Sequence, residues 1–157
     1  MGIRALEIAR ALGKEFDARL LVANDPAEVA AVAPDVPAFR VAPGELPLAA
    51  QGADAAVVSG HAANWWFHQV PNIPVAVDLY DPFFVENLHY APALGEAAAA
   101  NDHATLDLAI SRGDLFLCAS PEQRLFYAGS LYACGRIGPS SSSGRPGCSV
   151  PQLPNRK

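Results

Sequence analysis

Cysteines, long apolar runs and targeting signals are scarce in this sequence. Its 3 cysteines (Cys118, Cys134 and Cys148) are too few and too scattered for a disulfide framework or a zinc site, so we expect reduced thiols. No uninterrupted apolar run approaches the roughly 20 residues that a membrane-spanning helix needs. No signal peptide is recognisable, because residues 1–10 already carry charges throughout an amphipathic helical pattern. These absences predict a cytoplasmic protein without a transmembrane segment, either in solution or peripheral to a membrane.

Basic charge and cofactor-binding motifs are also lacking. The chain has 11 Lys and Arg against 16 Asp and Glu, a formal net charge of −5. Because a nucleic-acid footprint needs a basic patch or stripe, we expect no nucleic-acid partner. There is no G-x-G-x-x-G after a strand, no G-x-x-x-x-G-K-[ST] and no G-x-S-x-G. Their absence argues against a dinucleotide dehydrogenase, a P-loop enzyme and an α/β-hydrolase.

Short apolar segments alternate with helical segments along most of the chain. The strands are predicted at residues 19–23, 38–41, 55–58, 74–78 and 115–119. The longest helix is predicted to begin at Pro92 and to end at Arg112. Strands that alternate with helices imply right-handed crossovers and a parallel sheet covered on both faces. The predicted fold is therefore α/β and Rossmann-like, in one domain over residues 1–138.

Residues 139–157 differ in composition from the rest of the chain. They include a run of serines at 140–143 and several prolines, with no acidic residue and no apolar period. Such a segment cannot bury enough apolar surface to order itself, so we predict a disordered Ser/Pro-rich tail. It is interpreted as foreign to the domain, as after a truncation or a frame shift.

The stretch at residues 73–88 is the first candidate for a site. Its buried strand ends at Asp78, and Tyr80, Asp81 and Pro82 follow at once. Ligands of open parallel sheets bind outside the carboxyl ends of the strands. Asp81 is therefore a candidate base for a hydroxyl nucleophile or a ligand for sugar hydroxyls, while Asp78 supports the loop. In the alternative interpretation both acids only cap the following turn or helix.

Other polar residues follow neighbouring predicted strands. His61 comes after a strand and is a candidate general base, or else a turn histidine bonded to a backbone group. Ser120 and Arg124 lie at a helix start, where free backbone N–H groups favour anions. The spacing of the acids and histidines between 78 and 89 matches no dense metal motif, so no metal is predicted. The aromatic cluster at 65–67 is assigned mainly to core packing, with stacking on a sugar ring as the alternative.

Three segments together resemble a known enzyme family. They are Gly-Ile-Arg-Ala-Leu-Glu-Ile-Ala at 2–9, Val-Asp-Leu-Tyr-Asp-Pro-Phe at 77–83 with Glu-Asn-Leu at 86–88, and Gly-Asp-Leu-Phe-Leu-Cys-Ala-Ser at 113–120 with Gln-Arg at 123–124. In order and spacing they resemble the N-terminal half of a family 4 glycosyltransferase. Such enzymes have the GT-B fold, in which two Rossmann-like domains face each other across a cleft. The N-terminal domain mainly receives the acceptor, and the C-terminal domain mainly binds the nucleotide-sugar donor.

The resemblance implies roles for individual residues. Gly2 and Arg4 match the end of a glycine-rich loop near the donor phosphates, and Asp81 with Pro82 matches the loop beside the acceptor. His61 falls in a loop where the cleft would lie. A helix start at the cleft is matched by Ser120, Gln123 and Arg124. No cofactor is implied, the nucleotide sugar being a co-substrate, and the acceptor would be a sugar, a lipid or a small molecule.

The sequence also departs from the family pattern. The strand expected before Gly2 and the C-terminal donor-binding domain expected after Gly138 are both missing. We therefore expect a fragment of a hexosyltransferase-like enzyme that is inactive alone. The alternative is a non-catalytic Rossmann-like binding or regulatory module for a small anionic ligand. A third reading is a small hydrolase or phosphatase that uses Asp78 or Asp81.

Overall fold

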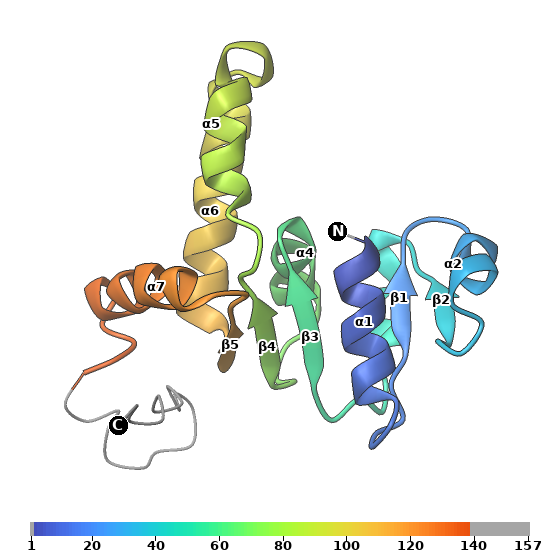
Figure 1. Cartoon of the computed structure of the whole chain (residues 1–157). Helices are drawn as coiled ribbons and strands as arrows, with labels where there is room; N and C mark the ends of the chain where they lie inside the picture. The colour runs from blue at the N-terminus through green and yellow to red at the C-terminus, as the bar shows by residue number, and fades with distance from the viewer. Residues whose placement is uncertain (1, 139–157) are drawn as a thin grey trace. The chain divides into compact units, whose positions relative to one another are not determined.

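The computed structural model describes residues 2–138, so the predicted tail lies outside the described residues (Figure 1). The chain divides after Gln51 into two compact units. The sequence predicts one domain over residues 1–138, and that assignment stays a prediction. Each unit has its own parallel sheet, with 2 strands in the first and 3 in the second. The predicted α/β class is confirmed.

The first unit contains one parallel strand pair. Its elements are α1 (Gly2–Leu12), β1 (Leu20–Val22), α2 (Pro26–Val32), β2 (Ala38–Arg40), the 3₁₀ helix η1 (Pro43–Glu45) and α3 (Leu46–Ala49). Leu20 of β1 pairs with Ala38 of β2. Asp25 begins α2, and its carboxylate accepts a hydrogen bond from the Ala27 N–H at 3.0 Å. This contact satisfies a backbone donor that the first turn of a helix leaves unpaired.

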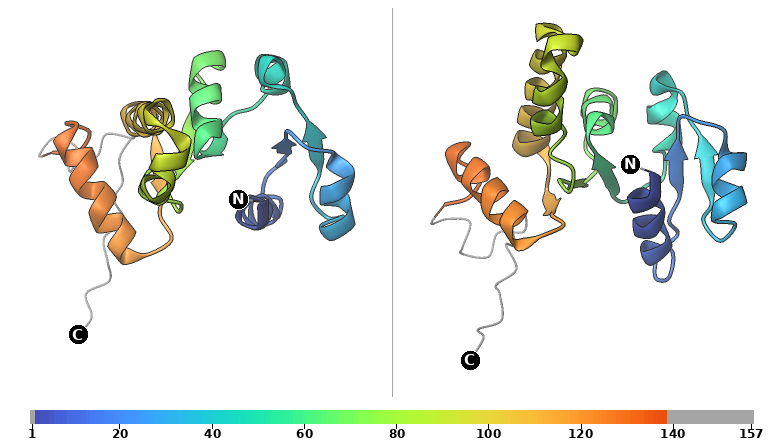
Figure 2. Two further views of the ribbon diagram at one scale, coloured as in Figure 1. Left: turned by 90° about the horizontal axis from the view of Figure 1, so that it is seen from above. Right: turned by 45° about the horizontal axis from the view of Figure 1, so that its top comes forward.

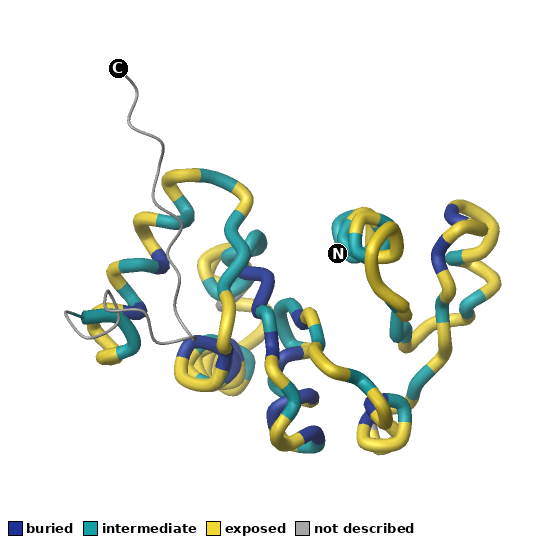
Figure 3. The backbone as a smooth tube through the Cα atoms, turned by 90° about the horizontal axis from the view of Figure 1, so that it is seen from below, coloured by how far each residue is buried: buried dark blue, intermediate teal, exposed yellow. Residues whose placement is uncertain are grey.

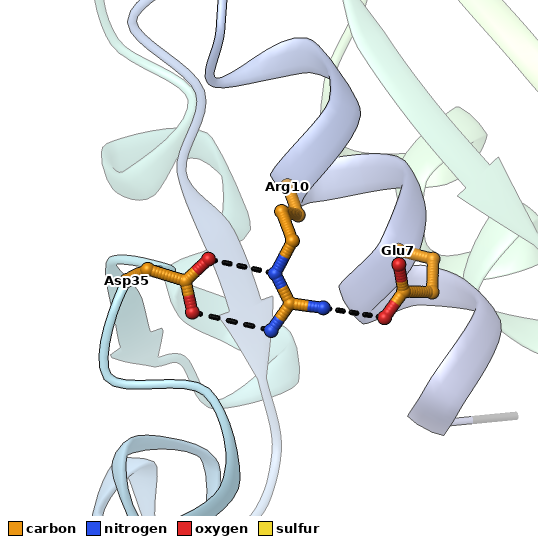
Figure 4. Close-up of polar contacts among 3 residues, drawn as sticks. All are labelled: Glu7, Arg10 and Asp35. Carbon is orange, nitrogen blue, oxygen red and sulfur yellow. Dashed lines mark hydrogen bonds and ion pairs between the residues drawn. The ribbon is translucent and has the colours of Figure 1, made fainter.

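An arginine joins α1 to the segment before β2 in this unit (Figure 4). Arg10 donates from Nε to Asp35 Oδ2 at 2.6 Å and from Nη2 to Asp35 Oδ1 at 3.1 Å, and it also pairs with Glu7 on its own helix. The hydrogen bond from Arg10 holds the pKa of Asp35 below its usual range. A two-point contact of this kind fixes the angle between the two groups as well as their distance.

The second unit contains the larger sheet. Its elements are β3 (Ala56–Ser59), α4 (His61–Gln69), β4 (Val75–Asp78), α5 (Phe83–Leu94), α6 (Glu96–Arg112), β5 (Leu115–Leu117) and α7 (Pro121–Ala133). The strands are parallel in the order β3-β4-β5, so β4 is central. Figures 1 and 2 show α5 and α6 side by side as a pair that extends away from the strands. This arrangement brings the start of α5 close to the sheet edge where β4 ends.

The core of this unit centres on β4. Val75 and Val77 are 3% and 1% exposed, which explains why this strand is a continuous apolar run. Buried positions (dark blue in Figure 3) form short stretches between half-buried and exposed ones. Gly113, between α6 and β5, has no room for a side chain, because a Cβ there would lie 2.7 Å from Val77 Cγ2. The close approach of α6 to the sheet therefore requires glycine at this position.

The predicted strands agree with the observed ones to within two residues at each end. The prediction of a helix that begins at Pro92 is wrong, since Pro92 lies inside α5 and the break falls at Gly95. Gly95 has φ 77°, a left-handed conformation that glycine adopts without steric cost. The turn between α5 and α6 therefore uses the glycine, and the proline is accommodated near the end of a helix.

Candidate functional site

The carboxyl ends of the three strands of the second unit lie along one edge of the sheet. Ser59, the last residue of β3, pairs with Asp78, the last residue of β4. Asp78 pairs in turn with Leu117, the last residue of β5. The segments that carry His61, Asp81 and Ser120 therefore leave the sheet at the same edge, as the sequence predicts.

His61 is held at this edge by a carboxylate of α6. It is the first residue of α4, after Gly60. Its Nε2 lies 3.2 Å from Oδ1 of Asp102. The Asp102 side chain is 6% exposed and the His61 side chain 39%. The pair thus joins a buried carboxylate to an imidazole that solvent reaches.

The second nitrogen of the His61 ring faces two other side chains of α6. The Asn101 amide nitrogen lies 3.3 Å from His61 Nδ1, and Thr105 Oγ1 lies 3.4 Å from it. Both distances are long for hydrogen bonds. If Nε2 donates its proton to Asp102, Nδ1 carries the lone pair and accepts from these groups. Because its only polar contacts within the described residues are these two long ones, Nδ1 is the nitrogen that can accept a proton from a ligand.

Each oxygen of the buried Asp102 carboxylate has a polar partner. Its Oδ2 accepts a hydrogen bond from the Asn87 amide at 2.7 Å, and its Oδ1 faces His61. On the other side of the network, the Asn64 amide donates to Thr105 Oγ1 at 3.2 Å. These contacts link α4, α5 and α6. Burial of a charge without such partners would be strongly unfavourable.

A hydroxyl, an imidazole and a carboxylate in sequence also suggest a nucleophilic triad. Thr105, however, is only 1% exposed, and its oxygen already accepts from Asn64. A substrate outside the protein cannot reach it. The accessible member is His61, and the arrangement suits an oriented general base for an external hydroxyl.

Aromatic rings continue from His61 across the helix starts. The His61 and Phe83 ring centroids are 5.0 Å apart, and Phe83 contacts Phe84 at 5.7 Å. Phe84 stacks on Phe126 of α7 at 6.1 Å with an interplanar angle of 17°. Phe126 is 52% exposed. The rings therefore offer flat apolar surface beside the imidazole.

The two acids after β4 have different surroundings. Asp78 is 4% exposed, which fits its predicted role as support for the loop. Asp81 is half-buried, and its carboxylate makes no hydrogen bond within the described part of the chain. Pro82 accepts from the Val85 N–H at 2.7 Å and so begins the turn into α5. Asp81 is thus available to a ligand, and its assignment as catalytic stays a prediction.

Ser120 and Gln123 are occupied by contacts within the protein. Ser120 Oγ accepts from the Gln123 N–H at 3.2 Å, as predicted for a helix cap. Gln123 Nε2 donates to the Tyr80 carbonyl at 2.7 Å, and its Oε1 accepts from the Ala119 N–H at 2.9 Å. These bonds fasten α7 to the segment after β4. A structural role therefore accounts for both side chains, and their assignment to substrate binding stays a prediction.

The start of α7 also carries its own anion. The pKa of Glu122 is lowered because its carboxylate accepts from its own backbone N–H and from Ser120. A carboxylate in the first turn offsets the partial positive charge of the helix start, which disfavours an external anion there. Arg124 is half-buried, and within residues 2–138 its guanidinium forms no ion pair. Gly2 and Arg4 begin α1 in the first unit, and their proposed roles likewise stay predictions.

Local sequence patterns do not identify four members of the network, namely Asn64, Asn101, Asp102 and Thr105, and Asn87 enters only through the Glu-Asn-Leu segment at 86–88. One signal was available. The buried residues of α6 are Asp102, Thr105, Ala109 and Ile110, which follow helical spacing along one face. A carboxylate on such a face is rarely buried unless it has a partner. That rule identifies Asp102 as a carboxylate that needs a polar partner, although it does not identify His61 as the partner.

The aromatic cluster on α4 divides between core and surface. Trp66 and Phe67 are each 6% exposed, whereas Trp65 is 47% exposed. The prediction that core packing dominates is confirmed for two of the three rings. Trp65, on the outer side of the helix, is the remaining candidate for stacking on a ligand.

Comparisons of the chain with protein-family models, with curated proteins and with solved structures found no match. Within the described residues, no helix is both long and apolar enough to cross a membrane. The same part of the chain contains no group of three His, Cys, Asp or Glu side chains that could hold a metal ion. Any functional assignment therefore depends on the geometry at the sheet edge and on the motifs of the sequence.

Proposed function

We propose that this chain is the acceptor-side part of a GT-B glycosyltransferase, in which a glycosyl group passes from a nucleotide sugar to an acceptor hydroxyl. The observation that carries the proposal is the contact between His61 Nε2 and buried Asp102 Oδ1 at 3.2 Å. It supplies an oriented, solvent-accessible base at the sheet edge where α/β proteins bind ligands. The three sequence segments that resemble family 4 glycosyltransferases add independent support.

The proposed reaction gives His61 one proton transfer. The acceptor hydroxyl approaches His61 Nδ1 from the side of exposed Asn101 and displaces its long contact, while buried Thr105 stays in place. As the oxygen attacks the anomeric carbon, its proton passes to Nδ1. The bond from that carbon to the nucleoside diphosphate breaks, and the electron pair leaves with the diphosphate. Asp102 stabilises the imidazolium that forms.

Asp81 would position the acceptor. A carboxylate with no internal hydrogen bond can accept from a second hydroxyl of a sugar or other polyol. Phe83, whose ring lies 5.0 Å from that of His61, offers an apolar surface to the same molecule. The acceptor class that fits these groups carries neighbouring hydroxyls beside an apolar face, as sugars do.

The donor would be held by a second Rossmann-like domain. Positively charged groups of that domain would stabilise the departing diphosphate electrostatically. On its own, the present chain is expected to bind an acceptor and not a nucleotide sugar. Calorimetry with uridine- and guanosine-diphosphate sugars tests this division, and tight binding of either would contradict it.

Acceptor binding is tested by following the His61 ring resonances by NMR. We expect monosaccharides or their alkyl glycosides to shift these resonances in the unmodified chain. His61→Gln and Asp81→Asn, each followed by the backbone amide resonances of residues 61–69, should weaken binding about tenfold, the loss expected for one hydrogen bond to a charged group. Glu86→Gln, an exposed change on α5, is the matched control. Resonances that stay in place with every hydroxylated probe would overturn the proposal.

The second candidate is a non-catalytic module for a small anionic ligand. Arg124 favours it, because its guanidinium has no ion pair in the described part of the chain. Glu122 disfavours it, since its carboxylate already lies at the start of α7. Inorganic phosphate separates the two candidates. Phosphate binding that disappears in Arg124→Gln would support the non-catalytic anion-binding module. The glycosyltransferase proposal requires instead that polyols shift the NMR resonances.

A further inference from the structure

A hollow lies at the opposite ends of the strands, among the residues that precede β4 and β5. Its volume is about 280 Å³, and its apolar walls come from Phe67 and Val70 at the end of α4 and from Ile73 and Pro74 before β4. Phe67 and Val70 are each 6% exposed, so they form the floor, and most of the apolar surface that a ligand can contact comes from Ile73 and Pro74. Pockets for drug-sized ligands begin at about 300 Å³, so this one suits a smaller molecule.

Two opposite charges line the same pocket without pairing. Arg112, the last residue of α6, and Asp114, just before β5, both contribute to its wall. The two side chains form no ion pair with each other or with another side chain in residues 2–138. Residues 139–157 contain no Asp or Glu side chain that could pair with Arg112.

Each of the two charged side chains makes one hydrogen bond within the protein and has further hydrogen-bonding atoms without a partner in the described chain. Arg112 Nη1 donates to the Phe67 carbonyl at 2.8 Å, and its Cζ lies 5.5 Å from the centroid of the Phe67 ring. The other N–H groups of the guanidinium have no partner in the described chain. Asp114 Oδ2 accepts from the Val75 N–H at 2.8 Å, which leaves Oδ1 without a partner there.

The rim of the pocket is stiff. Asn72 has φ 65°, a left-handed conformation that asparagine tolerates better than most residues. Pro74 fixes its own φ and restricts Ile73 before it. The backbone N–H of Asp114 donates to the Val75 carbonyl at 2.9 Å, in addition to the side-chain contact with Val75. A ligand would therefore meet a preformed wall and would lose little affinity in ordering it.

We infer that this pocket binds a small zwitterion with an apolar side chain, of the size and chemistry of a free aliphatic amino acid. An anion alone would meet Asp114, and a cation alone would meet Arg112. A neutral apolar molecule would displace water from both charges and replace none of their hydrogen bonds. A suitable molecule has a carboxylate for Arg112, an ammonium for Asp114 and an alkyl group for the apolar surface of Ile73 and Pro74.

The affinity should be modest. Arg112 and Asp114 are both exposed, and water and salt weaken pairs between exposed charges. We expect a dissociation constant on the order of 1 mM, as for many small ligands with few contacts. Raising the salt concentration should weaken binding further, because the charges carry the recognition.

The inference is tested by ¹⁵N NMR titration of the full chain with L-leucine. Two analogues remove one charge each: N-acetyl-L-leucine lacks the ammonium, and L-leucinamide lacks the carboxylate. Glycine keeps both charges and lacks the alkyl group. We expect leucine to shift the amide resonances of Val75 and Asp114, and each analogue to bind about tenfold more weakly, the equivalent of about 1.4 kcal/mol. Analogues that bind as well as leucine, or no shift at about 20 mM leucine, would overturn the inference.

Matched variants locate the binding within the pocket. Arg112→Gln removes the cation, and Asp114→Asn removes the anion while its amide oxygen can still accept from the Val75 N–H. Each should weaken leucine binding about tenfold. Arg40→Gln on β2 and Asp107→Asn on the exposed side of α6 make the same chemical changes elsewhere. Circular dichroism shows whether each variant is folded. Folded pocket variants that retain full affinity would contradict the assignment.

Discussion

His61 Nε2 lies 3.2 Å from Asp102 Oδ1, although the two residues are far apart in the sequence and belong to different helices. The carboxylate is buried and the imidazole is not. Asn87 holds the other carboxylate oxygen at 2.7 Å, so the orientation of Asp102 is fixed from two sides. The group that solvent reaches is thus positioned by one that solvent does not reach.

Asp102 should also contribute to the stability of the second unit. Asp102→Ala leaves the Asn87 amide unsatisfied and removes the partner of His61. We expect it to lower the free energy of unfolding by about 2–3 kcal/mol, the cost of unpairing buried polar groups. Urea denaturation followed by circular dichroism measures this. Asp107→Ala is exposed on the same helix and should change stability by less than about 0.5 kcal/mol. Equal effects of the two substitutions would show that the network adds nothing to stability.

Gly113 should tolerate no side chain. In Gly113→Ala, the new Cβ would lie 2.7 Å from Val77 Cγ2 and 2.9 Å from the Ala109 carbonyl oxygen. Either α6 or β5 must shift, which should cost about 1–3 kcal/mol of stability.

Gly129, inside α7, is the matched control for Gly113 because a Cβ there meets nothing within 4 Å. Gly129→Ala should stabilise the protein by about 0.5–1 kcal/mol, because alanine favours helix over glycine. Thermal denaturation of both variants shows whether each substitution raises or lowers the stability. A Gly113→Ala protein as stable as the unmodified chain would mean that α6 and β4 can separate enough to admit a methyl group.

Asp35 should titrate at lower pH than an ordinary aspartate. The Arg10 guanidinium lowers the pKa of its carboxyl group from the usual 3.8. The stabilisation from this pair is therefore present above pH 3.8 and is lost as the pH falls through the lower pKa of the folded state. NMR titration of the carboxyl carbon should show the shift, and Arg10→Gln should return the pKa toward 3.8. High salt should also move the Asp35 pKa toward 3.8, because both side chains are partly exposed and salt screens their attraction. An Asp35 pKa that does not change in Arg10→Gln would contradict the pairing of the two side chains.

The strands were predictable because each carries its own local signal. Val75 and Val77 lie in a short apolar run next to Pro74, and the polar residues that follow mark the strand end without any tertiary information. The cap of α7 was equally local, since Ser120 and Gln123 are three residues apart. His61 could be proposed as a site residue for the same reason, because it directly follows β3.

The partners of His61 could not be predicted in the same way. Asp102 meets His61 only after α6 has packed beside α4, and nothing near either residue in the sequence specifies the pairing. The position of the helix break is not specified locally, because proline and glycine compete as stop signals. Pro92 is the stronger local breaker, but the turn needs the positive φ that Gly95 provides. Local propensity therefore identified the elements, and tertiary packing decided the contacts between them.

Tyr127 should make the protein sensitive to alkaline pH. It is 2% exposed, and its hydroxyl has no hydrogen-bond partner within the described residues. Burial, followed by the charges of Cys118 and Asp81, raises its pKa from 10.0 to about 12. Between these values the unfolded chain loses the phenolic proton and the folded chain keeps it. Stability is therefore full below pH 10 and falls by about 2–3 kcal/mol as the pH rises to 12.

Tyr127→Phe separates this effect from general alkaline denaturation. The substitution removes the ionisable hydroxyl and keeps the ring against Phe126, whose centroid lies 5.1 Å away. Because the hydroxyl is unpaired, its loss should leave stability at pH 7 unchanged or slightly higher. Urea denaturation at several values between pH 8 and pH 11.5 should show a shallower decline for the variant than for the unmodified chain. Tyr132→Phe, on the exposed side of α7 at 70% exposure, should keep the steep decline. If both variants lose stability in parallel with the unmodified chain, another group is responsible for the alkaline transition.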